Sequence, residues 1–434
     1  MTNDMQQILK LALPAIISNI TVPLLGLVDL TIVGHMGNEV YIAAIAIGSM
    51  AFNVIYWLFG FLRMGTSGMT AQALGQRDGD AILKNGIRSL TIAVGIGLLM
   101  VVLRGPLRWC VMEIMQVQPS SAAMVRLYFD ICIFGAPACL AMYSLTGWFI
   151  GLQTTRIPMI VAIAQNVINI VLSVALVYGL GMNVEGVALG TTLSQWIAFA
   201  VSLVLAVSVL RLMIPKGTDL QYSFSDIFCR SELRRFFSVN SHIFLRTLCL
   251  VAVNTYFTSA GSAQGTMMLA VNTLLMTLFT IFSYVMDGFA YAGEALAGRH
   301  YGSGDRSALQ KVVRQLLKTG TVLSCIFTIA YALGGNMFLS LITDNASVLQ
   351  AASPYRFYTV MIPLLSFMAF IYDGVFIGIT ATRQMLVSCA IAAALFFLTY
   401  ITLSPFIGNN ALWTAYLAFL ACRGAIQHLQ MRSI

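Results

Sequence analysis

Charged side chains are scarce in this sequence. Only 9% of its 434 residues are Asp, Glu, Lys or Arg, whereas 59% are hydrophobic. A soluble protein of this size needs far more polar surface to cover its core. The composition therefore excludes a water-soluble globule and predicts a chain that is solvated mainly by lipid.

The residue patterns of metal sites, activated nucleophiles and phosphate-binding loops are missing as well. The eight cysteines show no CxxC pair or metal-ligand spacing, and there are only four histidines; we interpret the cysteines as packing residues. The loop Gly75-Gln-Arg-Asp-Gly-Asp80 lacks the Lys-Ser/Thr pair of a P-loop. The first ten residues lack the pattern of a cleavable signal. We therefore expect no enzyme, no cofactor, no metal and no removable signal.

Long apolar runs take up most of the chain. A bilayer requires roughly 20 apolar residues per helix, and about twelve such segments are present. They lie near residues 8–34, 43–69, 86–110, 125–152, 157–180, 186–211, 234–260, 267–297, 310–341, 351–379, 383–403 and 409–430. Continuous apolar runs such as 87–103 are too long for the alternating strands of a β-barrel. The expected fold class is an all-α integral membrane protein.

Lys and Arg are distributed unequally between the ends of these segments. With a cytoplasmic N-terminus, eighteen of them fall at inner ends, and only Arg104, Arg108, Arg126 and Arg356 fall at outer ends. This positive-inside bias predicts that both termini are cytoplasmic. The expected location is the inner (cytoplasmic) membrane, which the chain crosses several times. The net charge of +8 is then explained by anionic lipids at the inner surface, and not by nucleic acid.

The sequence contains an internal repeat, and corresponding residues of its two halves lie 227 positions apart. Gly147-Trp-Phe-Ile-Gly151 recurs as Gly374-Val-Phe-Ile-Gly378, and Asp78 corresponds to Asp305. Internal repeats in membrane proteins are typical of transporters, whose halves move around a central site. We therefore expect two parallel six-helix bundles and a substrate cleft between them.

A polar stretch separates the two halves. Residues 211–235 contain Pro, Gly and many charged residues. The predicted organisation is an N-terminal bundle at 1–212, a cytoplasmic linker at 213–233 and a C-terminal bundle at 234–434.

Asp29 is the ionisable residue that we consider most informative. It lies well inside the first span, and no basic residue lies within one helical turn of it. Such a residue is costly at membrane depth, and it can take up and release a proton there. Pro23 cannot donate to the Asn19 carbonyl and weakens the helix. We predict that protonation of Asp29 is coupled to bending near Pro23; the alternative is a static, hydrogen-bonded Asp.

Further polar residues are expected near Asp29. Asn166, Asn169 and Ser173 share one helical face of the fifth span. The predicted N-terminal polar network consists of Asn19, Asn166, Asn169, Ser173 and Thr191. Packing of amide side chains between helices is the alternative interpretation.

The C-terminal half carries a different set of ionisable residues, namely Arg246, Asp287, Glu294 and Asp373. A buried Arg is best explained as the partner of Asp287 or Asp373, so we favour structural or gating ion pairs over a second ion site. Arg126 and Asp130 are expected to pair as i, i+4 neighbours. The repeat aligns Asp29 with Tyr256 and Asn169 with Phe396, which places coupling in the N-terminal bundle.

Several motifs carry a resemblance to a known family. They are Leu11-Ala-Leu-Pro14, Ser18-Asn-Ile-Thr-Val-Pro-Leu-Leu-Gly-Leu-Val-Asp29, Ile32-Val-Gly-His35, Arg63-Met64, Thr70-Ala-Gln-Ala73, Met286-Asp-Gly-Phe-Ala-Tyr291, Tyr372-Asp-Gly-Val-Phe-Ile-Gly378 and Asn410-Ala-Leu-Trp413. Together they resemble the multidrug and toxic compound extrusion (MATE) family and its DinF-like branch, over nearly the whole chain.

The resemblance implies a two-lobed antiporter of twelve helices that expels drugs in exchange for protons or sodium. The branch's first-helix acid falls on Asp29, and its helix-bending proline falls on Pro23. The branch often has a second acid four residues after an Asn, but here Ser173 follows Asn169. One carboxylate is a poor sodium site, so the resemblance favours protons.

The expected function is proton-coupled efflux of amphipathic or cationic drugs by alternating access. The alternatives are sodium-coupled export at the same site and a flippase for lipid precursors. The expected partners are small-molecule drugs, protons or sodium, and membrane lipids, and the protein is expected to be a monomer.

Overall fold

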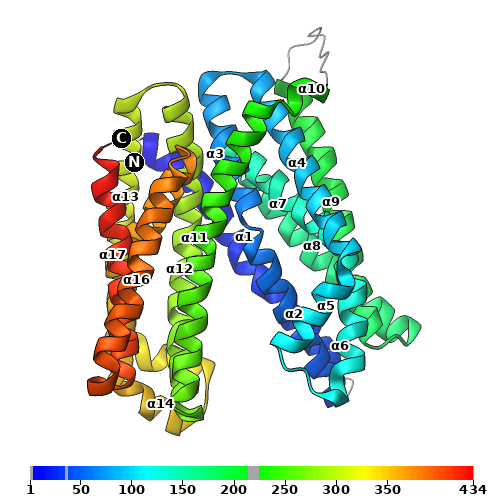
Figure 1. Cartoon of the computed structure of the whole chain (residues 1–434), viewed down its shortest axis with the longest axis vertical. Coiled ribbons are helices and arrows are strands. Elements are labelled where there is room, and N and C mark those ends of the chain that lie inside the picture. The colour runs from blue at the N-terminus through cyan, green and yellow to red at the C-terminus, as the bar shows by residue number, and fades with distance from the viewer. Residues whose placement is uncertain (1–2, 35–37, 214–223, 434) are drawn as a thin grey trace. The chain divides into compact units, whose positions relative to one another are not determined.

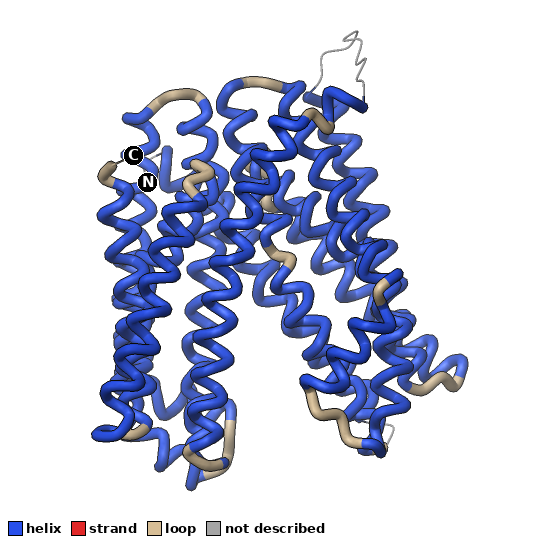
Figure 2. The backbone as a smooth tube through the Cα atoms, in the orientation of Figure 1, coloured by secondary structure: helices blue, strands red, loops and turns tan. Residues whose placement is uncertain are grey.

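The computed structural model describes residues 3–34, 38–213 and 224–433. Within these ranges, the side chains of residues 3, 22–25, 27, 213, 224, 225 and 336 lie outside the described part. The described residues form helices joined by short loops, with no strand among them (Figure 2). The predicted all-α fold class is confirmed.

Seventeen α-helices follow one another along the described chain (Figure 1). They are α1 (Asn3–Gly34), α2 (Glu39–Leu58), α3 (Phe61–Gln76), α4 (Gly79–Val102), α5 (Arg104–Ile114), α6 (Pro119–Cys132), α7 (Ala136–Gly151), α8 (Arg156–Val174), α9 (Val184–Met213), α10 (Phe224–Ile227), α11 (Arg230–Ala263), α12 (Thr266–Gly302), α13 (Arg306–Ile342), α14 (Ala346–Ala352), α15 (Arg356–Gly378), α16 (Thr382–Ile407) and α17 (Asn409–Met431). Short 3₁₀ turns cover Ile133–Gly135 and Ser353–Tyr355, and a π-helical turn covers Ala175–Gly179.

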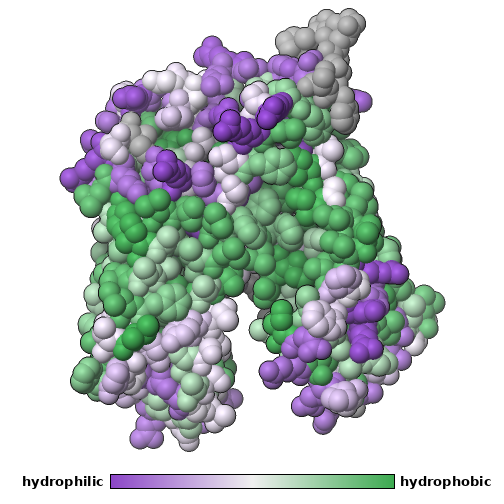
Figure 3. All heavy atoms as spheres, in the orientation of Figure 1, coloured by the Kyte–Doolittle hydropathy of each residue, from purple (hydrophilic) through white to green (hydrophobic). Residues whose placement is uncertain are grey.

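The number of long helices agrees with the expected number of spans. Ten segments of the described chain are long and apolar enough to cross a membrane, some of them joining two helices, such as Glu39–Gln76. Two further long helices, α1 with 32 residues and α17 with 23, bring the total to about twelve. On the face in Figure 3, apolar side chains cover the middle of each half and polar side chains gather towards its ends.

The chain divides into two compact units. One comprises Ile17–Phe237, and the other comprises Met1–Ile16 with Ser238–Ile434. The first turns of α1 belong to the second unit because they pack on α12: a Cβ at Gly288 would lie 2.3 Å from Ile16 Cγ1 and 2.9 Å from the Ala12 carbonyl oxygen. The predicted boundaries at 1–212, 213–233 and 234–434 stay a prediction, and residues 214–223 of the linker lie outside the described part.

The end of the predicted linker is fastened to the Ile17–Phe237 unit by a buried arginine. Arg88 of α4 is 2% exposed, and its Nε donates to the Ile227 carbonyl at 2.8 Å. Its Nη1 lies 3.2 Å from Glu232 Oε2. These bonds explain why the first residues of α11 group with the N-terminal half.

The two halves repeat the same close contact between helices. A Cβ at Gly147 of α7 would lie 2.1 Å from the Arg63 carbonyl oxygen of α3. A Cβ at Gly374 of α15 would lie 2.2 Å from the Ala290 carbonyl oxygen of α12. Both members of the second pair lie 227 positions after those of the first. Only glycine lets the backbones approach this closely, so the repeat seen in the sequence is also a repeat in packing.

The loops between helices repeat as well. Asp78 accepts a hydrogen bond from the Ala81 amide at 2.9 Å and caps α4, and Asp305 accepts one from the Ala308 amide at 2.9 Å and caps α13. These are side-chain caps of the kind that define helix starts. The duplicated Gly-Asp loops are therefore turns with capping residues.

Candidate functional site

Asp29 lies on α1 within the Ile17–Phe237 unit, with 2% of its surface exposed. The Thr191 hydroxyl of α9 donates to Asp29 Oδ2 at 3.1 Å. The Asn169 amide of α8, oriented with its nitrogen towards the carboxylate, donates to Oδ1 at 3.2 Å. No ion pair involves Asp29 in the part of the chain that is described. The carboxyl group is thus held by neutral donors on two helices.

Three acceptors lie within reach of the single proton of the Thr191 hydroxyl. Besides Asp29 it lies 3.0 Å from the Val187 carbonyl oxygen, one turn earlier on α9. In the orientation that donates to Asp29, the Asn169 amide oxygen is the third acceptor and lies 3.0 Å from the Thr191 hydroxyl. Three side chains from α1, α8 and α9 therefore form one buried polar network.

Helix α8 and the turn that follows it also bond to the α1 backbone on either side of Pro23. Asn166 donates from Nδ2 to the Thr21 carbonyl at 2.8 Å. Tyr178, in the π-helical turn, donates to the Ile32 carbonyl at 3.3 Å. Pro23 falls within the bounds of α1, but its side chain lies outside the described part. Turns of π-helix are frequent at functional sites.

Two other predicted members of the network have different surroundings. Ser173 is fully buried, and its Oγ has no hydrogen-bond partner among the described residues; it packs against Gly190 of α9. Asn19 lies ten residues before Asp29, which is roughly 15 Å along a helix. The structure thus brings Asn169 and Thr191 to Asp29, places Asn166 one turn away, and keeps Asn19 at a distance.

Tyr128 of α6 was not anticipated as a neighbour of Asp29. It is 3% exposed, interacts electrostatically with Asp29, and shares a hydrogen bond of 3.1 Å with Ser49 of α2. Its span shows no polar periodicity that would have marked it in the sequence.

A second polar cluster lies in the C-terminal half, around Asp373 of α15. Its Oδ2 pairs with Arg246 of α11 and, at 3.0 Å, with Arg423 of α17. Its Oδ1 accepts a hydrogen bond from Gln427 Nε2 at 2.6 Å. All four side chains are at least nine-tenths buried. This is an arrangement of two guanidinium groups around one carboxylate.

The four predicted ion-pair residues of this half differ in their surroundings. Arg246 and Asp373 are paired directly, and Asp287 interacts electrostatically with Arg246. Glu294 is buried on α12 with 1% exposed. Arg423, which was not among the predicted ion-pair residues, is buried with its guanidinium over the Phe370 and Phe419 rings at 5.9 and 5.8 Å. The spacing of Arg423 and Gln427 at i, i+4 was the available signal for a shared helix face.

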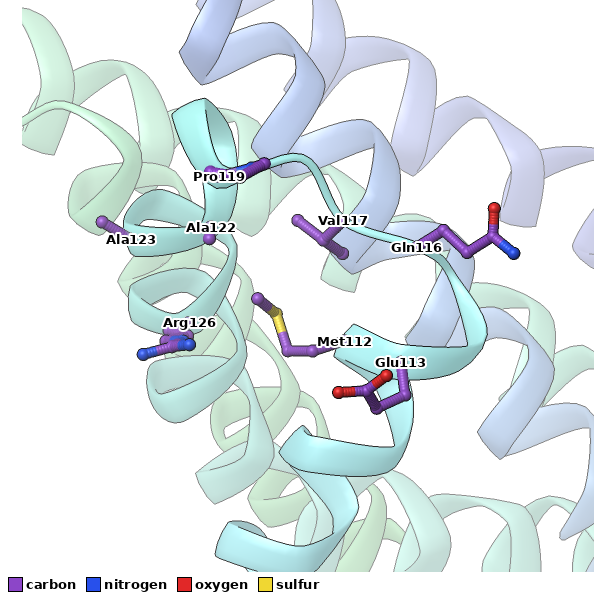
Figure 4. A pocket seen from close by; sticks show the side chains of 8 residues that line it. All are labelled: Met112, Glu113, Gln116, Val117, Pro119, Ala122, Ala123 and Arg126. Atoms are coloured by element: carbon purple, nitrogen blue, oxygen red, sulfur yellow. The ribbon is translucent and has the colours of Figure 1, made fainter.

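One predicted pair is wrong. Asp130 pairs with Arg108 of α5 and not with Arg126, its i, i+4 neighbour. Arg126 instead lines a cavity of about 580 Å³ between α5 and α6 (Figure 4). The lining residues are Met112, Glu113, Gln116, Val117, Pro119, Ala122, Ala123 and Arg126. None of them belongs to either polar cluster, so this cavity is separate from both.

Comparisons with known proteins agree with this architecture. The MatE family model matches residues 14–175 and 243–412, one block in each half. The chain is 38% identical over 424 residues to DNA damage-inducible protein F of Escherichia coli, covering 98% of this chain and 91% of that one. It is 26% identical to Protein DETOXIFICATION 44, chloroplastic, of Arabidopsis thaliana, covering 96% of this chain and 80% of that one.

Solved structures give the same fold. A crystal structure of MATE in the bent conformation matches with a TM-score of 0.87 at 18% identity, over 99% of this chain and 95% of that one. The straight conformation matches with a TM-score of 0.84 at 19% identity, over 99% and 96%. With a family model matched in both halves and a close relative along nearly its whole length, this chain belongs to the MatE family of multidrug and toxic compound extrusion transporters, and is a transporter and not an enzyme.

Proposed function

We propose that this protein is a proton-coupled antiporter that exports amphipathic, cationic compounds by alternating access, with Asp29 carrying the proton. The observation that carries the proposal is a buried carboxyl group held only by neutral donors. Such a group can change its protonation state without leaving a buried counter-charge behind. Relatives named multidrug export protein MepA and probable multidrug resistance protein NorM support drugs as the substrates.

Protonation rearranges the hydrogen bonds of the network. The ionised Asp29 accepts from Thr191 and Asn169. The protonated acid donates at one oxygen, so the bond there is reversed or lost, and the bond at the other oxygen is no longer strengthened by the negative charge. The Thr191 proton then turns to the Val187 carbonyl, which already lies within reach. Proton uptake therefore loosens the connection of α1 to α8 and α9.

The loosened segment can move because of Pro23. Asn166 holds the α1 backbone at Thr21, before the proline, and the Asp29 network holds it after the proline. Pro23 supplies no amide hydrogen, so the helix is weakest between these two attachments. When the attachment at Asp29 loosens, the later part of α1 bends relative to the earlier part. MATE structures of this fold have been solved in a bent and in a straight conformation. They support the proposal that one fold can adopt two states.

Protons fit the network better than sodium. Sodium is a hard cation that takes several oxygen ligands, whereas Asn169 presents its amide nitrogen to Asp29. Ser173 stands where the branch often carries a second acid. Sodium-coupled export at the same site remains the second candidate, because Thr191 and Ser173 supply further oxygens. We also propose that the protein is monomeric and lies in the inner membrane with both termini cytoplasmic.

The test is efflux from proteoliposomes under an imposed pH gradient. Asp29→Asn is expected to reduce proton-driven efflux to the level of protein-free liposomes, because an amide cannot exchange the proton. Asp130→Asn, the same change at an acid outside the network, is the matched control. Full proton-driven efflux by Asp29→Asn would remove Asp29 from the mechanism. Efflux driven by a sodium gradient at constant pH would establish the second candidate instead.

A further inference from the structure

The repeat offset of 227 residues aligns the Asp29 network with aromatic side chains in the C-terminal half. Asp29 corresponds to Tyr256, and Asn169 corresponds to Phe396. Ser173, the buried hydroxyl of the same α8 face, corresponds to Tyr400. Asp29 and Asn169, which contact each other in one half, and Ser173 on the same face of α8 are thus all aromatic in the other half.

These aromatic residues also converge in space. The Tyr256 ring of α11 lies 6.2 Å from Phe396, 5.1 Å from Phe397 and 5.5 Å from Tyr400, all of α16, at interplanar angles of 89°, 73° and 79°. We call Tyr256, Phe396, Phe397 and Tyr400 the ring cluster. Its ring contacts join α11 to α16, as the Asp29 network joins α1 to α8. Equivalent pairs of helices are therefore in contact in both halves, through polar side chains in one and aromatic side chains in the other.

The ring cluster is not a closed core. Phe396 is fully buried, Phe397 and Tyr400 are half-buried, and Tyr256 is 37% exposed. Among the described residues, neither the Tyr256 nor the Tyr400 hydroxyl forms a hydrogen bond with a protein group, in contrast to the Tyr416 hydroxyl, which donates to Asn254. Tyrosine places such a polar end where it can meet solvent or a ligand. The cluster thus runs from the interior of its unit to an accessible edge.

The side chains of the ring cluster present aromatic faces and two phenol hydroxyl groups. Aromatic faces carry partial negative charge and attract cations more strongly where water is excluded. The basic residue of α11 at membrane depth, Arg246, lies ten residues earlier, roughly 15 Å along the helix, and is engaged by Asp373. A cation at the ring cluster therefore meets aromatic faces and two phenol oxygens.

We propose that the ring cluster is a binding subsite for the exported compound, and that it selects aromatic organic cations. This inference rests on the proposed export of cationic compounds and assigns their recognition to the C-terminal half. Duplication then yielded two versions of one helix junction: one exchanges a proton through Asp29, and the other binds the cation through Tyr256 and its neighbours.

The test is equilibrium dialysis of purified protein against tetraphenylphosphonium, a cation, and tetraphenylborate, an anion of the same shape. Tyr256→Leu keeps an apolar side chain but removes the ring, and is expected to raise the Kd for the cation about tenfold. The Kd for tetraphenylborate is expected to stay within about twofold. Tyr256→Phe restores cation affinity because it restores the ring. Leu398→Ala, at a residue of α16 that is 62% exposed, is the control for surface changes on this helix.

Two outcomes overturn the proposal. One is an unchanged Kd for tetraphenylphosphonium in both Tyr256→Leu and Tyr400→Leu. The other is an equal loss of affinity for the cation and the anion, which would mean that the rings provide apolar contact without selecting for charge. Thermal unfolding in detergent shows whether Tyr256→Leu is folded. If it is not, the Kd values of Tyr400→Leu decide the proposal. Proton release is measured in the same samples. Asp29→Asn is expected to lose proton release and to keep its affinity for the cation, which tests the proposed proton coupling without testing the subsite. The two proposals can therefore fail separately.

Discussion

The two halves of this transporter keep the same packing and differ in their interior chemistry. Gly147 and Gly374 bring equivalent helices to the same close distance, and Asp78 and Asp305 cap equivalent helices. Where the N-terminal half places Asp29 among neutral donors, the C-terminal half has the ring of Tyr256. Positions that control how closely backbones approach were thus retained, whereas side chains facing the interior of each bundle were free to change.

The acids of the two halves also differ in what surrounds them. Asp29 contacts no basic residue in the described structure, whereas Asp373 is engaged by Arg246 and Arg423. Removing the charge of Asp373 leaves two buried guanidinium groups without their carboxylate. Removing the charge of Asp29 leaves no buried charge at all. One acid is therefore suited to exchange a proton, and the other is suited to hold three helices together.

The same acid-to-amide change should therefore have unequal effects on stability. Asp373→Asn is expected to lower the free energy of unfolding by about 3–5 kcal/mol, the cost of breaking a buried ion pair. Asp29→Asn is expected to change it by less than about 1 kcal/mol, since the amide still accepts a hydrogen bond from Thr191. Reversible unfolding in mixed micelles measures both. Similar losses in the two variants would contradict the distinction between them.

Glycine substitutions should, in contrast, affect the two halves alike. Gly147→Ala and Gly374→Ala each push a methyl group into a backbone carbonyl, and each is expected to cost about 1–3 kcal/mol of unfolding free energy. Gly95→Ala on α4 is the control, because a Cβ there meets nothing within 4 Å. The same micelle assay applies. Tolerance of one substitution but not the other would show that the packing repeat is less strict than the structure indicates.

The sequence predicted the helical fold from local patterns and the repeat from matched motifs; of the five residues expected around Asp29, Asn169 and Thr191 contact it in the structure. Apolar run lengths determine the spans, and the i, i+3 spacing of Asn166 and Asn169 determines a shared face. It did not predict Tyr128, and the i, i+4 spacing of Arg423 and Gln427 indicates a shared helix face but not their partner Asp373. Contacts between distant helices leave no mark on local periodicity. Asp130 was assigned to Arg126 for the same reason: the nearer residue in sequence was favoured, whereas α5 folds back to present Arg108.

Restoring a second acid near Asp29 should change the coupling ion. Ser173 is buried one turn after Asn169 and its hydroxyl has no partner in the described part of the protein. Ser173→Asp adds a second carboxylate one helical turn from Asn169, which contacts Asp29, and a second carboxylate favours a cation with several oxygen ligands. We expect sodium gradients to stimulate efflux in this variant and not in the original protein. Ser173→Asn, of similar size and neutral, is the control, and sodium stimulation in both would indicate that charge is not the cause.

The smallest expected effects concern the helix caps. Asp78→Ala and Asp305→Ala each remove one side-chain acceptor from the first turn of an equivalent helix, so amide hydrogen exchange should rise locally in both.

At α13 the effect should also depend on pH. The hydrogen bonds from the Ala308 amide and the Ser307 hydroxyl hold the pKa of Asp305 below its usual range. A carboxylate with a lowered pKa stabilises the fold above its unfolded-state pKa, and this contribution is lost as the pH falls through the folded-state value. Exchange at residues 306–309, corrected for the intrinsic rate, should therefore increase on acidification in the original protein but not in Asp305→Ala. A rise in exchange in only one of the two variants would mean that the repeat is kept in the helix contacts but not in the loops. Equal rises would show that the caps in the loops are repeated as well.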